Sequence, residues 1–417
     1  MKKFKRAMVG LKKQSKQRLF VVSAVAAGLA ISVFGVANFV LQADTSTTAS
    51  FEAELGAKSG VTTVADASAA SGSAVRFGVV TAPVENSFTL ASIPDTQVET
   101  SSASGAQRFN NRLQWLANNK TSLNLKYVWQ VGDLQDWDDA THSHYVRASD
   151  GLKILEQAGV PYGLTVGNHD TAAVCTGGSA CPGANTSLTF RNINTWHEFY
   201  PPSRFAGINT LCSEFSMFNA RLMAAAPAGV ATTNQNHPQF VKDRCAERNT
   251  TDNAYRTFTA GGLKWILINY EMWPRLPVQE WLETVLERHP DHNAILFTHM
   301  HLNGDGTIPG DFGGYGSPQG SPQAVQTNII TKFANVRFTF SGHTGVAACT
   351  SFTGANGNKI YSYLDNRREG SSPPNHVRLM KIDVAARTAT SQLYVPQNGQ
   401  TLSQGSNCNV TGITWVR

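Results

Sequence analysis

Strand-like apolar runs that end in polar, metal-capable residues constrain the fold of this 417-residue chain more than any other feature. The run at residues 128–131 ends in Gly132-Asp133, and a second carboxylate follows at Asp136. Further runs end in Asp95 with Gln97, in Asn168 with His169 and Asp170, in His299 with His301, and in His343. Ligands of open α/β sheets bind just beyond the carboxyl ends of the strands. Oxygen ligands and imidazoles that arrive from five strand ends therefore predict a metal site.

The order of strands and helices predicts an α/β protein. Strands are expected at residues 126–131, 160–166 and 263–270, and helices at residues 108–119 and 152–158. Another helix is expected to begin near Pro277, where apolar residues recur at helical spacing. The last part, from Arg337 to Leu393, contains strand patterns with few helices between them. This order favours a sandwich of two sheets with helices on the outside.

The first 43 residues are predicted to direct the chain out of the cytoplasm. Residues 1–18 carry eight basic residues and no acidic residue, and residues 19–41 contain no charge. A segment of this length can span a bilayer, and its basic flank stays in the cytoplasm by the positive-inside rule. A cleaved signal peptide and a retained membrane anchor both fit. We therefore expect an extracellular protein, either secreted or tethered to the outer face of the cytoplasmic membrane.

Net charge gives no support for nucleic-acid binding. The chain has 35 basic and 29 acidic residues, but eight of the basic residues lie in the first 18 positions. The other 27 basic residues leave the remainder with a net charge of about −2. A nucleic-acid-binding domain is instead expected to carry a strongly basic surface.

Three regions follow from composition: residues 1–43 for targeting, a spacer at 44–84, and a main domain at 85–417. The spacer is rich in Ala, Ser, Thr and Gly, a composition that cannot bury a core. Within it, residues 51–78 resemble the opening strands of a carbohydrate-binding jelly roll but are too short for that module. A tether or an edge hairpin is the preferred interpretation, and cell-wall or carbohydrate association is the alternative. Residues 171–262 are interpreted as an insertion in the main domain.

All six cysteines lie in the part of the chain that is expected to be exported, which predicts three disulfides. Six cysteines allow 15 pairings, and the sequence alone does not choose among them. Proximity along the chain favours Cys175–Cys181 and Cys212–Cys245, which leaves Cys349–Cys408.

The motifs resemble those of the calcineurin-like metallophosphoesterases, the family that includes the purple acid phosphatases. That family carries D-x-H, G-D-x-x-D/N, G-N-H-D/E, a single His after a strand, and G-H-x-H. The matching segments here, in the same order, are Asp95-Thr96-Gln97, Gly132–Asp136, Gly167–Asp170, His299 and Gly342–Gly345. The resemblance covers roughly residues 86–394. It implies a four-layer αββα sandwich of two mixed β-sheets.

The resemblance also implies a centre of two metal ions, drawn from Fe, Mn and Zn. Asp133 would bridge the ions, and Asn168, His299 and His343 would complete the second site. The first site would keep Asp95, but Gln97 and Gly345 stand where the family has imidazoles. An amide oxygen is a poorer donor than imidazole for Zn or Fe, and glycine offers no side chain. The first site is therefore expected to be weakened.

Two further residues carry the expected chemistry. His169 resembles the histidine that protonates the leaving group in this family, and Asp136 resembles the carboxylate that orients it. His301 and Asp170 are expected to contact the metal ligands and not the metal ions themselves. Asp305 and Asp311 lie in a Gly-rich loop and are candidates for a replacement ligand, although a loop without a metal contact is the simpler interpretation.

These residues predict an exported enzyme that hydrolyses phosphate mono- or diesters with a metal-activated water. The alternative is a non-catalytic or weakly active cell-surface binding protein that keeps the scaffold with a degraded first metal site. The missing imidazoles favour the alternative, whereas His169 and Asp136 favour the enzyme, because a binding protein needs no proton donor. Asp133 and Asp136 also have a structural interpretation, since Asp is a preferred N-cap of a following helix.

Overall fold

The computed structural model describes residues 61–65, 73–77, 85–183, 187–215, 236–311, 313, 317–366, 376–403 and 408–417. The chain divides into two compact units, Met1–Pro83 and Val84–Arg417. In the first unit, β1 (Val61–Ala65) and β2 (Ser73–Phe77) form an antiparallel pair. The predicted targeting segment, residues 19–41, lies outside the described residues. Among the helices that are described, none has the length and apolar character needed to span a membrane.

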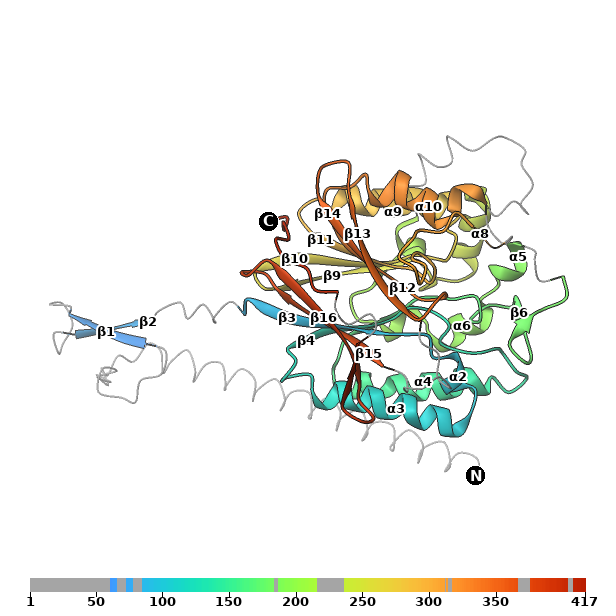
Figure 1. Cartoon of the computed structure of the whole chain (residues 1–417), viewed down its shortest axis with the longest axis horizontal. Coiled ribbons are helices and arrows are strands. Elements are labelled where there is room, and N and C mark those ends of the chain that lie inside the picture. Colours follow the sequence, from blue (N-terminus) through green and yellow to red (C-terminus); the bar gives the residue numbers. More distant parts are fainter. Residues whose placement is uncertain are drawn as a thin grey trace, which may run out of the picture. The chain divides into compact units, whose positions relative to one another are not determined.

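One of the two large sheets in the second unit has six strands (Figure 1). In spatial order they are β17 (Gln400–Leu402), β16 (Thr388–Val395), β15 (Val377–Asp383), β3 (Ser87–Ile93), β4 (Leu125–Gln130) and β5 (Tyr162–Leu164). Strands β3, β4 and β5 are parallel to one another, whereas β15, β16 and β17 pair antiparallel. The three parallel strands are those that the sequence predicted to end in polar residues.

The other sheet has seven strands and is also mixed. In spatial order they are β13 (Ala347–Thr353), β14 (Lys359–Asp365), β12 (Val336–Ser341), β11 (Asn293–Phe297), β10 (Leu263–Asn269), β9 (Ala254–Ala260) and β8 (Asn209–Thr210). The central strands β10, β11, β12 and β14 run parallel, and the outer strands pair antiparallel. Central parallel strands are buried on both faces, which fits the complete burial of β11 and β12 and the nearly continuous apolar run of β11.

An aromatic core lies between the two sheets and joins them. The ring of Trp129, from β4, stacks on Phe297 of β11 with a centroid distance of 4.1 Å. Phe297 in turn stacks on Phe340 of β12 at 5.3 Å, and Trp129 on Tyr127 at 5.4 Å. Offset stacking of this kind adds to the free energy gained by burying apolar surface. The stack fixes the position of β4 relative to β11. It therefore also fixes the position of the loops that follow these two strands.

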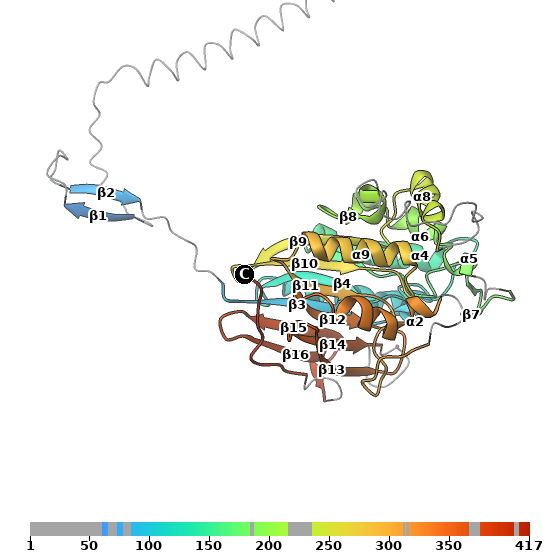
Figure 2. The same cartoon turned by 90° about the horizontal axis from the view of Figure 1, so that it is seen from above.

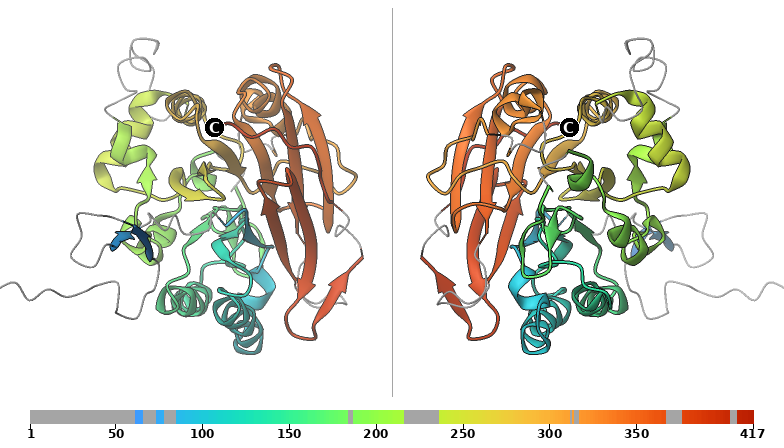
Figure 3. Two further views of the ribbon diagram at one scale, coloured as in Figure 1. Left: turned by 90° about the vertical axis from the view of Figure 1, so that its left-hand side faces the viewer. Right: turned by 90° about the vertical axis from the view of Figure 1, so that its right-hand side faces the viewer.

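Helices cover the other face of each sheet (Figures 2 and 3). The six-stranded sheet shares a core cluster with α3 (Ala103–Asn118), α4 (Ser143–Gln157) and α6 (Asn194–Phe199). The seven-stranded sheet shares another with α8 (Pro238–Glu247), α9 (Leu276–Arg288) and η4 (Gln326–Ile330). Pro277 lies in the first turn of α9, and the predicted apolar stripe is buried: Val278, Trp281, Leu282, Val285 and Leu286.

The predicted insertion needs a correction at its end. Among the described residues between 171 and 208 the elements are short: β6 (Val174–Cys175), β7 (Ser179–Ala180), α5 (Ser187–Phe190), α6 and η2 (Pro202–Arg204). However, β8 and β9 belong to the seven-stranded sheet, because β9 pairs with β10 along its whole length. The sequence AYRTFTA of β9 lacks a strict alternation of polar and apolar residues, so its pattern did not mark it as a strand.

The three disulfides join the cysteines that proximity along the chain favoured. They are Cys175–Cys181, Cys212–Cys245 and Cys349–Cys408. The first closes the β6–β7 hairpin, and the third ties β13 to the C-terminal segment. Three disulfides are consistent with an extracellular protein.

Candidate metal centre

The loops that follow the parallel strands of both sheets meet at one edge. In the six-stranded sheet, the Val131 N–H donates to the Ile93 carbonyl at 3.2 Å, so the β3 and β4 loops stay paired. In the seven-stranded sheet, the Gly342 N–H donates to the His299 carbonyl at 2.8 Å. One bond crosses between the sheets, because His299 Nδ1 lies 2.8 Å from the Val131 carbonyl. The predicted polar residues are therefore brought towards a common point.

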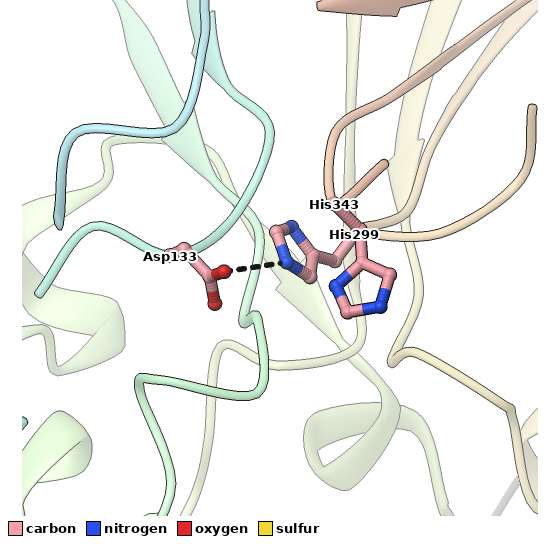
Figure 4. Close-up of side chains that lie close together, drawn as sticks. All are labelled: Asp133, His299 and His343. Carbon is pink, nitrogen blue, oxygen red and sulfur yellow. Dashed lines mark ion pairs between the residues drawn. The ribbon is translucent and has the colours of Figure 1, made fainter. Parts of the chain in front are cut away.

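Asp133, His299 and His343 form the metal-capable cluster of the described residues. One ligand-capable atom from each lies within 4.8 Å of the others. Figure 4 shows the Asp133 carboxylate directed at the His299 ring, with His343 beside it. His299 Nε2 lies 2.9 Å from Asp133 Oδ2, and the two imidazole centroids are 5.1 Å apart. Asp133 and His299 are buried, whereas His343 is partly exposed.

The contacts of His299 orient its ring for a cation. A carbonyl only accepts, so Nδ1 donates its hydrogen to Val131, and Nε2 of the neutral ring presents a lone pair. Nε2 and the Asp133 carboxylate are then two electron-rich groups at 2.9 Å, an arrangement that calls for a proton or a metal ion between or beside them. Burial acts to raise the pKa of Asp133, but with a proton in this place the positive charge of His299, together with that of His169, holds the pKa well below its usual range. The carboxylate is therefore ionised at neutral pH.

The close approach of the two sheets requires a glycine at position 132. Gly132 has φ 102°, and a Cβ there would lie 2.2 Å from His299 Nδ1. The neighbouring Asp133 and His343 also have positive φ, 54° and 71°. Non-glycine residues in this conformation are strained, and such strain is concentrated at functional sites.

Asn168 and Asp170 complete the surroundings of Asp133. The His169 N–H donates to Asp133 Oδ1 at 2.9 Å, which places the Asn168 main chain beside the carboxylate. The Asn168 amide oxygen is shielded from solvent and accepts no hydrogen bond within the described part of the chain. Asp170 accepts from the Gln135 N–H at 3.0 Å and from the Gly167 N–H at 2.8 Å, so it fastens two loops together. Burial and the charge of Asp133 raise the pKa of Asp170 to about 8.

His169 is anchored by Asp136. Its Nδ1 donates to the Asp136 carbonyl at 2.6 Å and lies 3.2 Å from the Asp136 carboxylate. Burial acts to lower the pKa of His169, but the charge of Asp133 and the contacts with Asp136 raise it to about 9. His169 is therefore a cation at neutral pH, with Nδ1 held and Nε2 at the opposite side of the ring.

The residues expected at the first metal site are arranged differently. Asp95 is fully buried, and its Oδ1 accepts from the Gln97 N–H at 3.0 Å where α2 (Gln97–Thr100) begins. Gly345 provides no side chain, and its main chain lies against Gly304. No second cluster of three acidic, His or Cys side chains forms around Asp95 in the described residues. The donor set thus fits one ion, near Asp133, and does not fit an ion at the Asp95 position.

The remaining candidates lie outside the cluster. His301 is buried beside Gln326, and burial lowers its pKa to about 4. Asp305 Oδ1 accepts from the N–H and the hydroxyl of Thr307, and Asp311 Oδ1 accepts from the Gly313 N–H. Each of these two exposed carboxylates closes its own turn and does not replace a missing imidazole.

Sequence reasoning missed Trp273, which lies against the cluster. Its indole packs edge-on to the His343 ring at a centroid distance of 6.2 Å, and its φ is 48°. Trp273 follows β10 by only a few residues, and β10 is a central parallel strand like those that precede the other site residues. Its place shortly after a central parallel strand is the sequence signal that indicates it.

Comparison with known proteins finds relatives at low similarity. No family model matches the chain. A curated relative, the uncharacterized protein YvnB of Bacillus subtilis (strain 168), is 23% identical over 261 residues, which are 63% of this chain and 16% of that protein. The chain thus spans only about a sixth of the length of this relative.

Solved structures similar to the chain include dimetal and purple acid phosphatases. A dimetal phosphatase from Danio rerio is 13% identical, with 73% of this chain and 95% of that chain covered and a TM-score of 0.38. The purple acid phosphatase PPD1 from yellow lupin (Lupinus luteus) seeds is 11% identical, with 76% and 52% covered and a TM-score of 0.43. GAP50, the anchor in the inner membrane complex of Plasmodium, is 9% identical, with 78% and 88% covered and a TM-score of 0.37.

Proposed function

We propose that this protein is a calcineurin-like metallophosphoesterase that hydrolyses phosphate mono- or diesters. The observation that carries the proposal is the buried pair of Asp133 and His299, 2.9 Å apart, with His343 beside it. A carboxylate and two imidazoles in this arrangement are suited to a transition metal ion. The motifs around these residues agree with the same family in order and spacing.

Asp133, Asn168, His299 and His343 would hold the ion, which we expect to be Fe, Mn or Zn. The orphaned amide oxygen of Asn168 and the oriented Nε2 of His299 support this assignment. When bound, the ion would lower the pKa of a water molecule and offset the charge of the phosphate. The Val131 carbonyl keeps the His299 ring in the orientation that binding needs.

His169 would supply the proton to the leaving oxygen. Its Nδ1 is fixed on Asp136, so Nε2 is the atom from which a proton can be delivered. Asp136 would keep the ring oriented and stabilise its cationic form. Asp170 would keep the His169 loop in place through its two main-chain hydrogen bonds.

We also propose that the protein is exported. The basic residues at 1–18, the uncharged segment at 19–41 and the three disulfides support this location. Retention of residues 19–41 would tether the phosphoesterase to the outer face of the cytoplasmic membrane, and their removal would release it. An association with carbohydrate through residues 51–78 stays a prediction.

A binding protein on the same scaffold is the second candidate. The absence of imidazoles at Gln97 and Gly345 favours it, because the metal centre then has fewer ligands. The anchored His169 favours the enzyme, since proton donation has no purpose in a binding protein.

Hydrolysis of p-nitrophenyl phosphate and bis(p-nitrophenyl) phosphate, with Mn²⁺, Zn²⁺ or Fe²⁺ supplied, tests the proposal. We expect turnover that depends on added metal and is lost in Asn168→Ala. Asn111→Ala, on the exposed face of α3, is the control and should keep full turnover. Absence of turnover with every metal, in a folded protein that binds metal, would favour the binding protein.

A further inference from the structure

Positions 345 and 304 touch through their main chains. A Cβ on Gly345 would lie 2.7 Å from the Gly304 Cα and 3.1 Å from its nitrogen, and Gly345 has φ 66°. In the opposite direction, a Cβ on Gly304 would lie 3.1 Å from the Gly345 Cα. Two glycines thus pack against each other at the motif position where the resemblance to the family implies an imidazole. The space for a side chain at position 345 is filled by the Gly304 backbone. The chain therefore differs from the family in its loop path as well as in the loss of one ligand.

The loop that carries Gly304 is held against the β12 loop by hydrogen bonds. The Thr344 hydroxyl donates to the Leu302 carbonyl at 3.1 Å, and the Leu302 N–H donates to the Ser341 hydroxyl at 3.2 Å. The Asn303 N–H donates to the Thr307 carbonyl at 2.8 Å and closes the turn around Gly304. An imidazole at position 345 would have to displace this fastened backbone.

The two other residues expected at the first metal site, Asp95 and Gln97, are also committed to local structure. Asp95 Oδ1 accepts the Gln97 N–H, and Gln97 is the buried first residue of α2. Helix α2 is fixed to the Asp133 loop, because the Thr100 hydroxyl donates to the Leu134 carbonyl at 2.9 Å. Apart from the shared Asp133, this position offers one carboxylate and one neutral amide, fewer than the four ligands typical of a protein zinc site.

We propose that the centre holds a single divalent transition ion, bound by Asp133, Asn168, His299 and His343. The imidazole that position 345 carries in two-ion centres has no room here, because the Gly304 backbone lies against Gly345. This inference rests on the proposed metal-dependent function, which it sharpens by fixing the number of ions.

Titration of the full chain with Mn²⁺ tests the inference directly. The protein is first freed of metal with a chelator, and binding is followed by calorimetry and by elemental analysis after gel filtration. We expect about one Mn²⁺ per chain and an electron paramagnetic resonance spectrum of isolated Mn²⁺. Two ions per chain with a spin-coupled spectrum would overturn the single-ion inference and leave the proposed function intact. Failure to bind Mn²⁺, Zn²⁺ or Fe²⁺ at all would overturn both.

Two variants distinguish the two positions without any activity assay. Asp95→Asn should bind the same number of ions as the parent protein, with a Kd changed by less than about twofold. Loss of one ion per chain in this variant would contradict the inference. Gly345→His restores the imidazole but not its space, so it should gain no ion. A second bound ion in Gly345→His would show that the Gly304 backbone does not close the position.

Discussion

The two halves of the metal centre are built on the same edge of the sheets but differ in what their loops deliver. Around Asp133, two strand-end loops direct His299 and His343 to one point. At the other expected site, Asp95 accepts a main-chain hydrogen bond from Gln97, and Gly345 packs on the Gly304 main chain and provides no side chain. The sheet framework is common to both halves. The comparison shows that the loop path decides whether a strand end becomes a ligand site.

The same difference is present within one turn, between His343 and Gly345. Both have positive φ, 71° and 66°. At His343 the strained conformation is kept by a residue with a side chain, which places an imidazole 5.1 Å from the His299 ring. At Gly345 the same conformation costs little, and it serves main-chain packing. Strain is therefore present where a ligand is delivered and relieved where none is.

Removal of an imidazole from the ligand-bearing half should have the largest effect. His299→Ala should weaken Mn²⁺ binding by more than about 100-fold, since loss of even an indirect contact to a metal site costs about 10–100-fold. Calorimetry measures this change. His292→Ala is the matched control, because His292 contacts Asp291 away from the centre and should leave Mn²⁺ affinity unchanged. Tight Mn²⁺ binding by His299→Ala would show that the ion lies elsewhere.

An added methyl group in each half of the centre should show which half supports metal binding, because both variants should lose stability but only one should lose affinity for Mn²⁺. Gly132→Ala should lower the free energy of unfolding by about 3 kcal/mol, from overpacking and backbone strain, and should also weaken Mn²⁺ binding by displacing His299. Gly345→Ala should lower stability by a similar amount without loss of Mn²⁺. Urea unfolding and calorimetry measure the two effects.

Gly159→Ala measures the loss of unfolding free energy that a positive φ alone causes, without a steric contact. Gly159 has φ 64°, and a Cβ there would meet nothing within 4 Å, so this variant should lose only about 1 kcal/mol. Equal losses in Gly132→Ala and Gly159→Ala would mean that the contact with His299 has no energetic consequence.

The raised pKa of His169 should appear as a pH dependence of stability in the metal-free protein. Its folded-state pKa, about 9, lies above the ordinary value of 6.5, so the proton stabilises the folded state. This stability is fully present below pH 6.5 and is lost as pH rises through 9. At 1.36 kcal/mol per pKa unit the loss is at most about 3 kcal/mol.

The difference between wild type and His169→Gln in urea unfolding, measured from pH 6 to pH 10, isolates this contribution. Asp170 also has a raised pKa, but it is present in both proteins and its effect largely cancels. A difference that stays constant with pH would contradict the ionised pair of His169 and Asp133.

The hairpin beside Asp136 should have the smallest effect. A Cβ on Gly178 would lie 3.0 Å from Asp136 Oδ1, so the turn closed by Cys175–Cys181 packs on the carboxylate that anchors His169. Cys175→Ser with Cys181→Ser should lower kcat by less than about 10-fold and leave Mn²⁺ binding unchanged. Reduced Mn²⁺ affinity in this variant would show that the hairpin supports the ligands themselves.

Much of the ligand-bearing half could be predicted from sequence because its signals are local. Asp133, His299 and His343 follow buried strands at short distances, and the parallel arrangement of those strands follows from the strand–helix order. The missing imidazoles of the other half could also be predicted, from Gln97 and Gly345, but the contact of Gly304 with Gly345 could not, because it joins two loops whose paths no local pattern encodes. Trp273 lies a few residues after β10 and could have been indicated by that place in the chain, whereas its positive φ could not be inferred from composition.

A crystal structure of the protein soaked in Mn²⁺, with anomalous data collected above the Mn absorption edge, would locate every bound Mn²⁺ ion. We expect a single anomalous peak, bounded by the side chains of Asp133, Asn168, His299 and His343. Two peaks about 3.5–4 Å apart, the spacing of two-metal sites, would contradict the single-ion centre. A single peak at any other place would contradict the assignment of the ligands.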